Sequence, residues 1–343
     1  MCLNIEDTSP LLRFLIAGQL QRETIVTPSG QANVDIPGGN ILYAAAGMGI
    51  WDKAVGLISR VGEDYPVEWL DKVKSYGFDT HGVRILPESI DLRAFHAYPD
   101  RETHQTDNPV AAFARIGQPF PRSLLGFTDS TPAISNRTQP SSLTIRQTDI
   151  PVSYLDATAA HLCPLDYLSH SLIPTALRQG HVTTISLDPS AGYMNPIFWD
   201  NFPGLLKGIT AFICNEDKIT SLFQGRTVQL WQMAEGIASF GCDIVIIKRG
   251  AAGQILYNNA NHTRWIIPAY PSQVIDPTGA GDSFCGGWLA GFRETYDPLE
   301  AALFGNISAS FTVEGSGPFY PLGALPGLPQ ARMESLRDRV RRA

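Results

Sequence analysis

The sequence predicts an α/β protein with three layers, in which a mostly parallel central sheet is covered by helices on both faces. Short apolar runs of strand length alternate with longer segments of helical length. One such unit runs from a strand at 159–163 through a helix at 165–180 to a strand at 182–187. Two further apolar runs, at 211–214 and 243–248, continue the pattern. Runs of this kind are typical of parallel strands buried on both faces and joined by helical crossovers.

Composition narrows the function classes. The chain has 343 residues, of which 44% are hydrophobic and 17% charged, and a formal net charge of −7. An acidic protein of this kind is not expected to have nucleic acid as its main partner. No apolar run reaches the roughly 18 residues of a membrane span, and the five cysteines show no metal-ligand spacing. We therefore expect a cytoplasmic, globular protein with reduced cysteines and no membrane partner.

The N-terminal part is expected to start the central sheet and to add a second, smaller one. The apolar run at 11–17 predicts a buried strand. Residues 19–33 are polar and β-branched around a Pro-Ser-Gly turn, which predicts a hairpin, and the alternating residues 92–98 are expected to pair with it. Two glycines then precede an alanine-rich helix at 41–49. They indicate either tight helix–sheet packing or a ligand that approaches the backbone.

Two regions do not follow this pattern. Residues 100–150 are rich in proline and polar residues, so we expect an irregular insertion or flap there. Residues 331–343 carry several arginines and are expected to form a basic, solvated helix or tail. The remaining chain, residues 1–330, is expected to form one domain.

The stretch 276–282 reads Asp-Pro-Thr-Gly-Ala-Gly-Asp and precedes an apolar segment. Asp and Thr favour helix starts, and small residues just inside a helix leave its first N–H groups free. Those donors and the helix dipole form a site for a phosphate. Asp282 is unexpected there, because phosphate repels a carboxylate. Either it caps the helix, or it accepts a proton from a hydroxyl that attacks the phosphate.

The whole string resembles the signature of the ribokinase-like (PfkB) family of small-molecule carbohydrate kinases. The resemblance implies that the amides of Gly279, Ala280 and Gly281 form an anion hole and that Asp282 is the catalytic base. It implies ATP and Mg²⁺ as phosphate donor and metal, and a sugar-like acceptor. It also implies a lid from about 19–37 and 91–99, and it leaves room for a homodimer through that lid.

The resemblance extends to acceptor-binding positions. Members of the family carry Asn and Asp after their first strand, where this chain has Gln21 and Glu23. The Gly-Gly turn is present as Gly38-Gly39, but Tyr43 stands where an Asn is expected. Tyr43 is either a core aromatic or a residue that stacks on or donates to the substrate. These changes imply an acceptor other than ribose itself.

The resemblance also marks nucleotide-binding positions, which lie at the carboxyl ends of strands, in the loops near the central motif or in the small-residue helix expected at 298–311: Asn215, Lys248, Gly250, Thr278, Asn306 and Gly315. The loop around Gly315 is where the family holds adenine and in some members a monovalent cation. Lys218 stands where the family has a Glu that orders the waters of Mg²⁺. The metal site is therefore left unassigned, with Mg²⁺ held through the nucleotide near Asn215. Lys218 either contacts the nucleotide phosphates or points to solvent.

Two other functions stay open. A nucleoside is the second candidate acceptor, because Tyr43 suits a base. A degenerate kinase fold that only binds ligands is favoured by Lys218 and disfavoured by the intact motif at 279–282. The chain has neither the Walker pattern nor a Gly-x-Gly-x-x-Gly after its first strand, so P-loop and dinucleotide sites lack their usual glycines.

Overall fold

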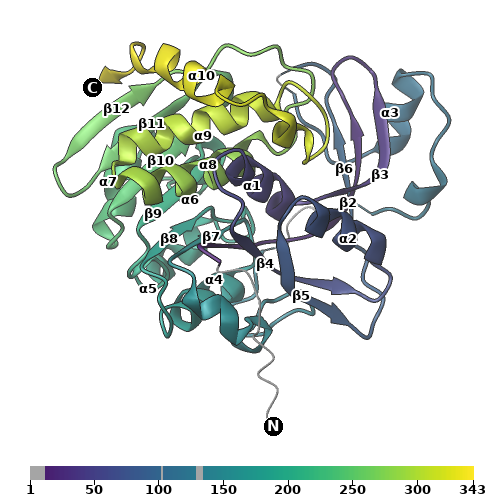
Figure 1. The fold of residues 1–343 in the computed structure, drawn as a ribbon, viewed down its shortest axis with the longest axis horizontal. Coiled ribbons are helices and arrows are strands. Elements are labelled where there is room, and N and C mark those ends of the chain that lie inside the picture. Colours follow the sequence, from purple (N-terminus) through teal and green to yellow (C-terminus); the bar gives the residue numbers. More distant parts are fainter. Residues whose placement is uncertain (1–11, 102, 129–133) are drawn as a thin grey trace, which may run out of the picture.

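The computed structural model describes residues 12–101, 103–128 and 134–343. Its main sheet contains the strands Phe14–Ala17 (β1), Val55–Gly62 (β4), Asp79–Leu86 (β5), Ala159–Leu162 (β7), Thr184–Leu187 (β8), Ala211–Asn215 (β9), Ile244–Lys248 (β10), Gln254–Asn258 (β11), Thr263–Ile267 (β12) and Arg341–Arg342 (β13). Their spatial order is β13-β12-β11-β10-β9-β8-β7-β1-β4-β5 (Figure 1). The strands from β10 to β5 pair in parallel, and β11, β12 and β13 are antiparallel.

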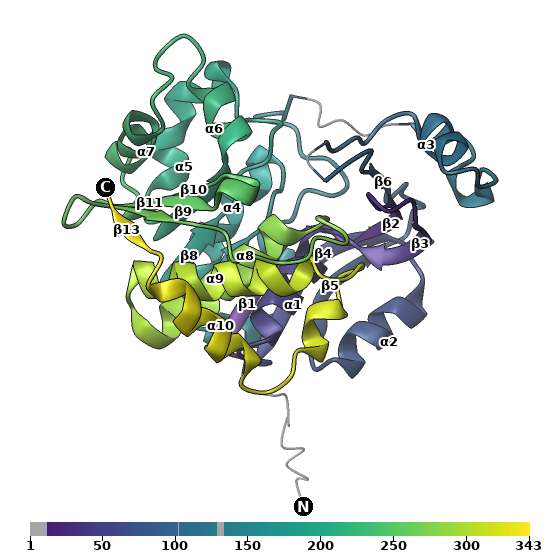
Figure 2. The same ribbon diagram turned by 90° about the horizontal axis from the view of Figure 1, so that it is seen from above.

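Helices lie on both faces of this sheet, as the view from above shows (Figure 2). One layer comprises Tyr167–Leu177 (α4), Phe202–Leu206 (α5), Glu216–Leu222 (α6) and Leu230–Ser239 (α7), and the other comprises Asn40–Gly49 (α1), Val67–Ser75 (α2), Ala280–Thr295 (α8), Pro298–Thr312 (α9) and Leu328–Arg337 (α10). Successive side chains of a strand point to opposite faces. Leu15 of β1 therefore joins the core beneath the first layer, and Ile16 joins the core beneath the second. The predicted three-layer fold is confirmed.

Glycines bring α8 into close contact with α1. A Cβ at Gly47 would lie 2.2 Å from the carbonyl oxygen of Ser283, and one at Gly286 would lie 1.9 Å from that of Ala44. Any side chain at either position would push the helices apart, because real Cβ atoms do not approach backbone atoms so closely. This packing holds the N-terminal end of α8, where the candidate site lies, against the neighbouring helix.

The predicted small sheet is also present. It consists of Gln21–Val26 (β2), Ala32–Gly38 (β3) and Arg93–Ala97 (β6), in the order β3-β2-β6, and it lies beside the main sheet (Figure 1). β2 and β3 form the expected antiparallel hairpin, while β6 pairs with β2 in parallel. We call this sheet the lid.

The insertion contains a helix that the sequence did not predict, Pro109–Arg115 (α3). Asn108 caps it by accepting from the Ala111 N–H, and proline occupies its first turn. Phe113 of α3 packs with Phe95 and Val26 of the lid in a separate apolar cluster. The insertion therefore covers one face of the lid. Short 3-10 turns lie at Arg122–Leu124, Gln147–Asp149, Val152–Asp156, Pro196–Asn201, Gly250–Ala252 and Tyr320–Gly323.

Residues 331–343, expected to form a basic, solvated helix or tail, are mostly exposed and are partly helical, but they also attach to the rest of the fold. Helix α10 begins at Leu328 and buries Leu336 in the core next to α9. After it, Arg341 and Arg342 pair with Ile266 and Trp265 of β12 and so add an edge strand to the main sheet. Among the described residues, no helix combines the length and apolarity needed to cross a membrane.

Candidate active site

The turn before α8 leaves backbone donors free. Gly279 adopts a φ of 71°, and α8 starts at Ala280 without a side-chain cap. Within the described ranges, the N–H groups of Gly279, Gly281 and Asp282 have no acceptor, whereas the Ala280 N–H donates to the Pro277 oxygen at 3.3 Å. Of the three amides expected to bind phosphate, those of Gly279 and Gly281 are therefore free in this structure, and the Asp282 amide beside them is free as well. Free amides at the positive end of a 16-residue helix form a site suited to an anion.

Gly279 is required by two independent features. Its positive φ disfavours other residues, and a Cβ there would lie 2.0 Å from Cγ of the Tyr43 ring. Tyr43 therefore packs directly against the turn. This contact places α1 behind the free amides and limits how the turn can move.

Asp282 lies in the first turn of α8 beside these amides. Burial raises the pKa of its carboxyl to about 7, although neighbouring Lys248 opposes the shift. Nothing in the described part of the chain donates a hydrogen bond to its carboxylate. A carboxylate with a pKa near neutrality and free oxygens is suited to accept a proton from a bound hydroxyl.

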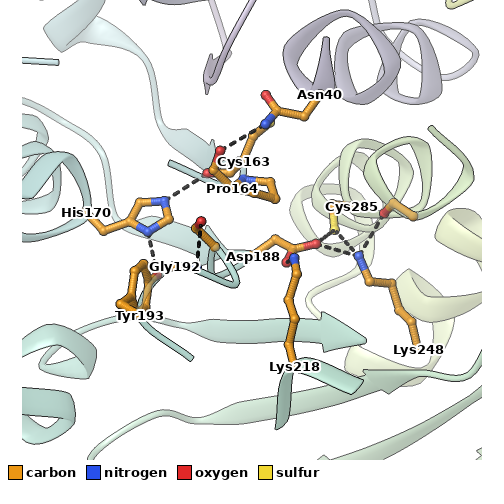
Figure 3. A network of polar contacts seen from close by, with 12 residues as sticks. Asn40, Cys163, Pro164, His170, Asp188, Gly192, Tyr193, Lys218, Lys248 and Cys285 are labelled. Carbon is orange, nitrogen blue, oxygen red and sulfur yellow. Dashed lines mark hydrogen bonds and ion pairs between the residues drawn. The ribbon is translucent and has the colours of Figure 1, made fainter. Parts of the chain in front are cut away.

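Two lysines share one buried carboxylate next to this helix (Figure 3). Lys218 of α6 donates to Asp188 Oδ1 at 2.8 Å, and Lys248 at the end of β10 donates to Asp188 Oδ2 at 2.6 Å. Burial would raise the pKa of Asp188, but the two ammonium groups lower it to about 2. Lys248 also donates to the Gly281 carbonyl oxygen at 3.0 Å. The lysine–aspartate cluster is thereby attached to the first turn of α8.

The lid contributes a second buried carboxylate. Glu23 of β2 accepts from the Gly39 N–H at 2.7 Å and from Tyr43 Oη at 2.9 Å. Burial raises the pKa of Glu23 to about 7, in spite of these hydrogen bonds. A Cβ at Gly38 would lie 2.1 Å from the Glu23 carboxyl carbon. The Gly-Gly turn therefore makes room for Glu23, and Tyr43 connects it to Gly279.

The lid also contacts the loop before α8 directly. Thr278 Oγ1 donates to Tyr98 Oη at 3.1 Å, next to the end of β6. On the other side, Asn33 of β3 donates to Ser316 Oγ at 2.8 Å, and Ser316 in turn donates to Asp276. Asp276 accepts the Thr278 N–H at 2.9 Å. These bonds hold the lid over the free amides, where it can exclude water.

The other residues predicted to bind nucleotide or acceptor differ in whether they are exposed to a ligand or already bonded within the protein. Asn215 is exposed at the end of β9, opposite Lys248 of β10, and Gly250 follows with a φ of 54°. Asn306 is buried and bonded to the Tyr270 N–H at 2.9 Å and the Pro268 oxygen at 2.8 Å, so its side chain braces a loop. The tight contact at Gly315 is with the ring of Tyr320, and Gln21 is half-buried at the start of the lid.

Two carboxylates near Asn215, those of Glu216 and Asp188, are already paired. Among the residues described, no three His, Cys, Asp or Glu side chains are grouped so that they could hold a metal ion. Glu216 accepts from Arg249 at 3.0 Å, and Asp188 is shared by the two lysines. These residues fit a Mg²⁺ ion held mostly by phosphate oxygens and water, which is a common arrangement for this ion.

Comparisons with known proteins agree with this geometry. The sequence model of the pfkB family of carbohydrate kinases matches residues 158–323. The chain is 25% identical over 294 residues to the cytidine kinase of Thermococcus kodakarensis, covering 85% of this chain and 92% of that protein. Its fold is similar to that of Vibrio cholerae fructokinase with bound fructose, ADP and calcium. The TM-score is 0.66 at 16% identity, over 96% of this chain and 99% of the fructokinase chain. The fold is also similar to that of Burkholderia thailandensis nucleoside kinase in complex with inosine. The TM-score is 0.65 at 18% identity, over 94% of this chain and 98% of the nucleoside kinase chain.

The matched family region includes the turn at 276–282, the cluster of Asp188 and both lysines, and helices α8 and α9. The chain shares its overall fold with these solved structures. The protein is therefore a kinase of the PfkB family with the ribokinase-like fold.

Proposed function

We propose that the protein transfers the terminal phosphoryl group of ATP to a hydroxyl of a sugar or sugar-like molecule. The observation that carries this proposal is the pairing of free amides at the start of α8 with Asp282, whose pKa of about 7 suits a general base. A site built only to bind phosphate gains nothing from a carboxylate at this position.

In the proposed reaction, the residues of this chain align the two reactants and neutralise the charge of the phosphoryl group, and they form no covalent bond to either reactant. The amides of Gly279, Gly281 and Asp282 bind oxygens of the phosphoryl group as it moves. Asp282 accepts the proton of the attacking hydroxyl, while Glu23 of the lid binds another hydroxyl of the acceptor. Mg²⁺ supplies charge neutralisation between the phosphates when bound.

A nucleoside is the second candidate acceptor. The chain resembles the cytidine kinase over 92% of that protein's length, which supports an acceptor in which a pentose carries a base. An aromatic group lies where the lid joins the insertion: the rings of His96 and Tyr98 both stack on that of His104, with centroids 5.2 Å and 5.0 Å apart, respectively. Aromatic rings of this kind can stack on a base.

An acceptor panel distinguishes these possibilities. ADP formation from MgATP is measured with hexoses, pentoses, polyols, cytidine, inosine and adenosine at equal concentrations. We expect acceptor-dependent ADP release with at least one sugar or nucleoside, and the preferred class assigns the substrate. If no acceptor increases ADP release while ATP still binds, the protein is a binding protein and the proposed activity is wrong.

The pH dependence of the reaction follows from Asp282. Its carboxyl must be ionised to accept a proton, and its pKa is raised from 3.8 to about 7. We therefore expect kcat/KM to be highest above pH 7 and to fall about tenfold per pH unit well below it, because the base becomes protonated. The profile is measured from about pH 5 to about pH 9 with the best acceptor. A flat profile down to about pH 5 contradicts the assignment.

A further inference from the structure

The two lysines that share Asp188 differ in how many hydrogen-bond donors they have left. An ammonium group has three N–H donors. Lys248 uses them on Asp188 Oδ2 at 2.6 Å, on the Gly281 oxygen at 3.0 Å and on Cys285 Sγ at 3.5 Å. All its donors are therefore directed at protein atoms. Lys248 fixes the first turn of α8 and has no donor left for a ligand.

Lys218 is in the opposite situation. Its ammonium donates to Asp188 Oδ1 at 2.8 Å, and the structure describes no second acceptor for it. Two donors remain, on a side chain that is 15% exposed and extends on a flexible four-carbon stem. Lys218 approaches Asp188 from α6, while Lys248 approaches it from β10 (Figure 3). Asp188 thus connects the ammonium of Lys218, which has free donors, to the ammonium of Lys248, which bonds to Gly281.

The charges of the cluster favour an anion at this position. Two ammonium groups face one ionised carboxylate, whose pKa is lowered to about 2. The next carboxylate, Asp282, has a pKa of about 7 and so only partly offsets the second positive charge at neutral pH. A positive charge in a poorly solvated place gains more from an incoming anion than it would in water.

We propose that Lys218 is the phosphate-binding cation of this kinase and that Lys248 is a positioning residue. When the nucleotide binds, Lys218 directs its two free donors to phosphate oxygens and Asp188 continues to hold both ammonium groups. This assignment rests on the proposed use of ATP. It makes Lys218, rather than Lys248, the lysine that senses how many phosphates a nucleotide carries.

The test compares three adenosine ligands that carry three, two or no phosphates. Dissociation constants of ATP, ADP and adenosine are measured by calorimetry, without acceptor, for wild type, Lys218→Met and Lys218→Arg. Charge-assisted hydrogen bonds are strong enough that Lys218→Met should weaken ATP and ADP binding about tenfold or more. Adenosine binding should be unchanged, and Lys218→Arg should restore much of the loss. Lys207→Met, at an exposed lysine that precedes β9, is the matched control.

The proposal is wrong if each of the three ligands binds Lys218→Met as tightly as it binds wild type. It is also wrong if the variant loses the same factor in affinity for ATP, ADP and adenosine. Thermal unfolding of both variants shows whether the fold is intact, which we expect because Lys248 still neutralises Asp188. The assay is separate from turnover. A wild type that binds ATP through Lys218 but phosphorylates no acceptor refutes the proposed reaction and leaves this inference standing.

Discussion

Replacing Asp282 with Asn is expected to lower kcat by roughly 10²-fold or more, because the amide cannot accept the proton of the attacking hydroxyl. The substitution keeps the size of the side chain. It also keeps the neutral state that burial favours, since the pKa of Asp282 is raised to about 7. The folded protein should therefore be at least as stable as the wild type. Initial rates with the best acceptor and saturating MgATP give the comparison.

Measurements of ATP affinity show whether a lower rate of Asp282→Asn reflects a slower phosphoryl-transfer step or a damaged binding site. ATP affinity of Asp282→Asn should stay within about threefold of wild type or improve, because a negative charge next to the phosphates has been removed. Asp297→Asn is a control at an aspartate in the helix-capping position of α9, where a fall in rate is not expected. A rate for Asp282→Asn close to wild type would show that another group is the base.

Replacing Asp188 with Asn is expected to cost about 3–5 kcal/mol of folding stability, because two ammonium groups then lose their common charged partner in a buried place. Asp188 is 2% exposed, and Lys218 and Lys248 are 15% and 12% exposed. The free energy of unfolding is measured by urea denaturation at neutral pH. Asp217→Asn, at an exposed aspartate on the first turn of α6, is the control and should change little.

Acid unfolding tests the same contact without a mutation. The pKa of Asp188 is lowered from 3.8 to about 2, so its contribution to stability is present above the unfolded value and is lost as the pH falls between these two values. Wild type should lose stability in this range more steeply than Asp188→Asn. A difference in unfolding free energy that is the same at neutral pH and near pH 2 would contradict an ionised Asp188 in the fold.

The parts of the fold predicted best are those with a strong local pattern. Buried strands such as β9 and β10 are continuous apolar runs. Two kinds of element were missed. Strands at the edge of the main sheet, such as β5 with its pattern of exposed residues, carry a weaker signal because only part of each strand is buried. Helix α3 lies in a proline-rich stretch and is stabilised by packing on the lid, which no local pattern reveals.

The site shows a similar division. The turn at 279–282 is contiguous, so its glycines and carboxylate could be recognised together in the sequence. Asp188 was not predicted as a site residue, although it directly follows the buried strand β8, where ligand sites of parallel sheets lie. Its role depends on lysines 30 and 60 residues away. Tyr43 also needed the structure, which places its ring on Gly279 and its hydroxyl on Glu23.

Phosphorus NMR of the complete reaction distinguishes phosphoryl transfer to an acceptor from simple hydrolysis of ATP. Wild type, MgATP and the best acceptor of the panel are followed together, with Asp282→Asn in parallel. We expect wild type to form ADP and a phosphate ester of the acceptor in equal amounts, and the variant to form neither at a comparable rate. ADP appearing with inorganic phosphate and no ester, or an ester formed equally fast by the variant, would contradict the proposed reaction.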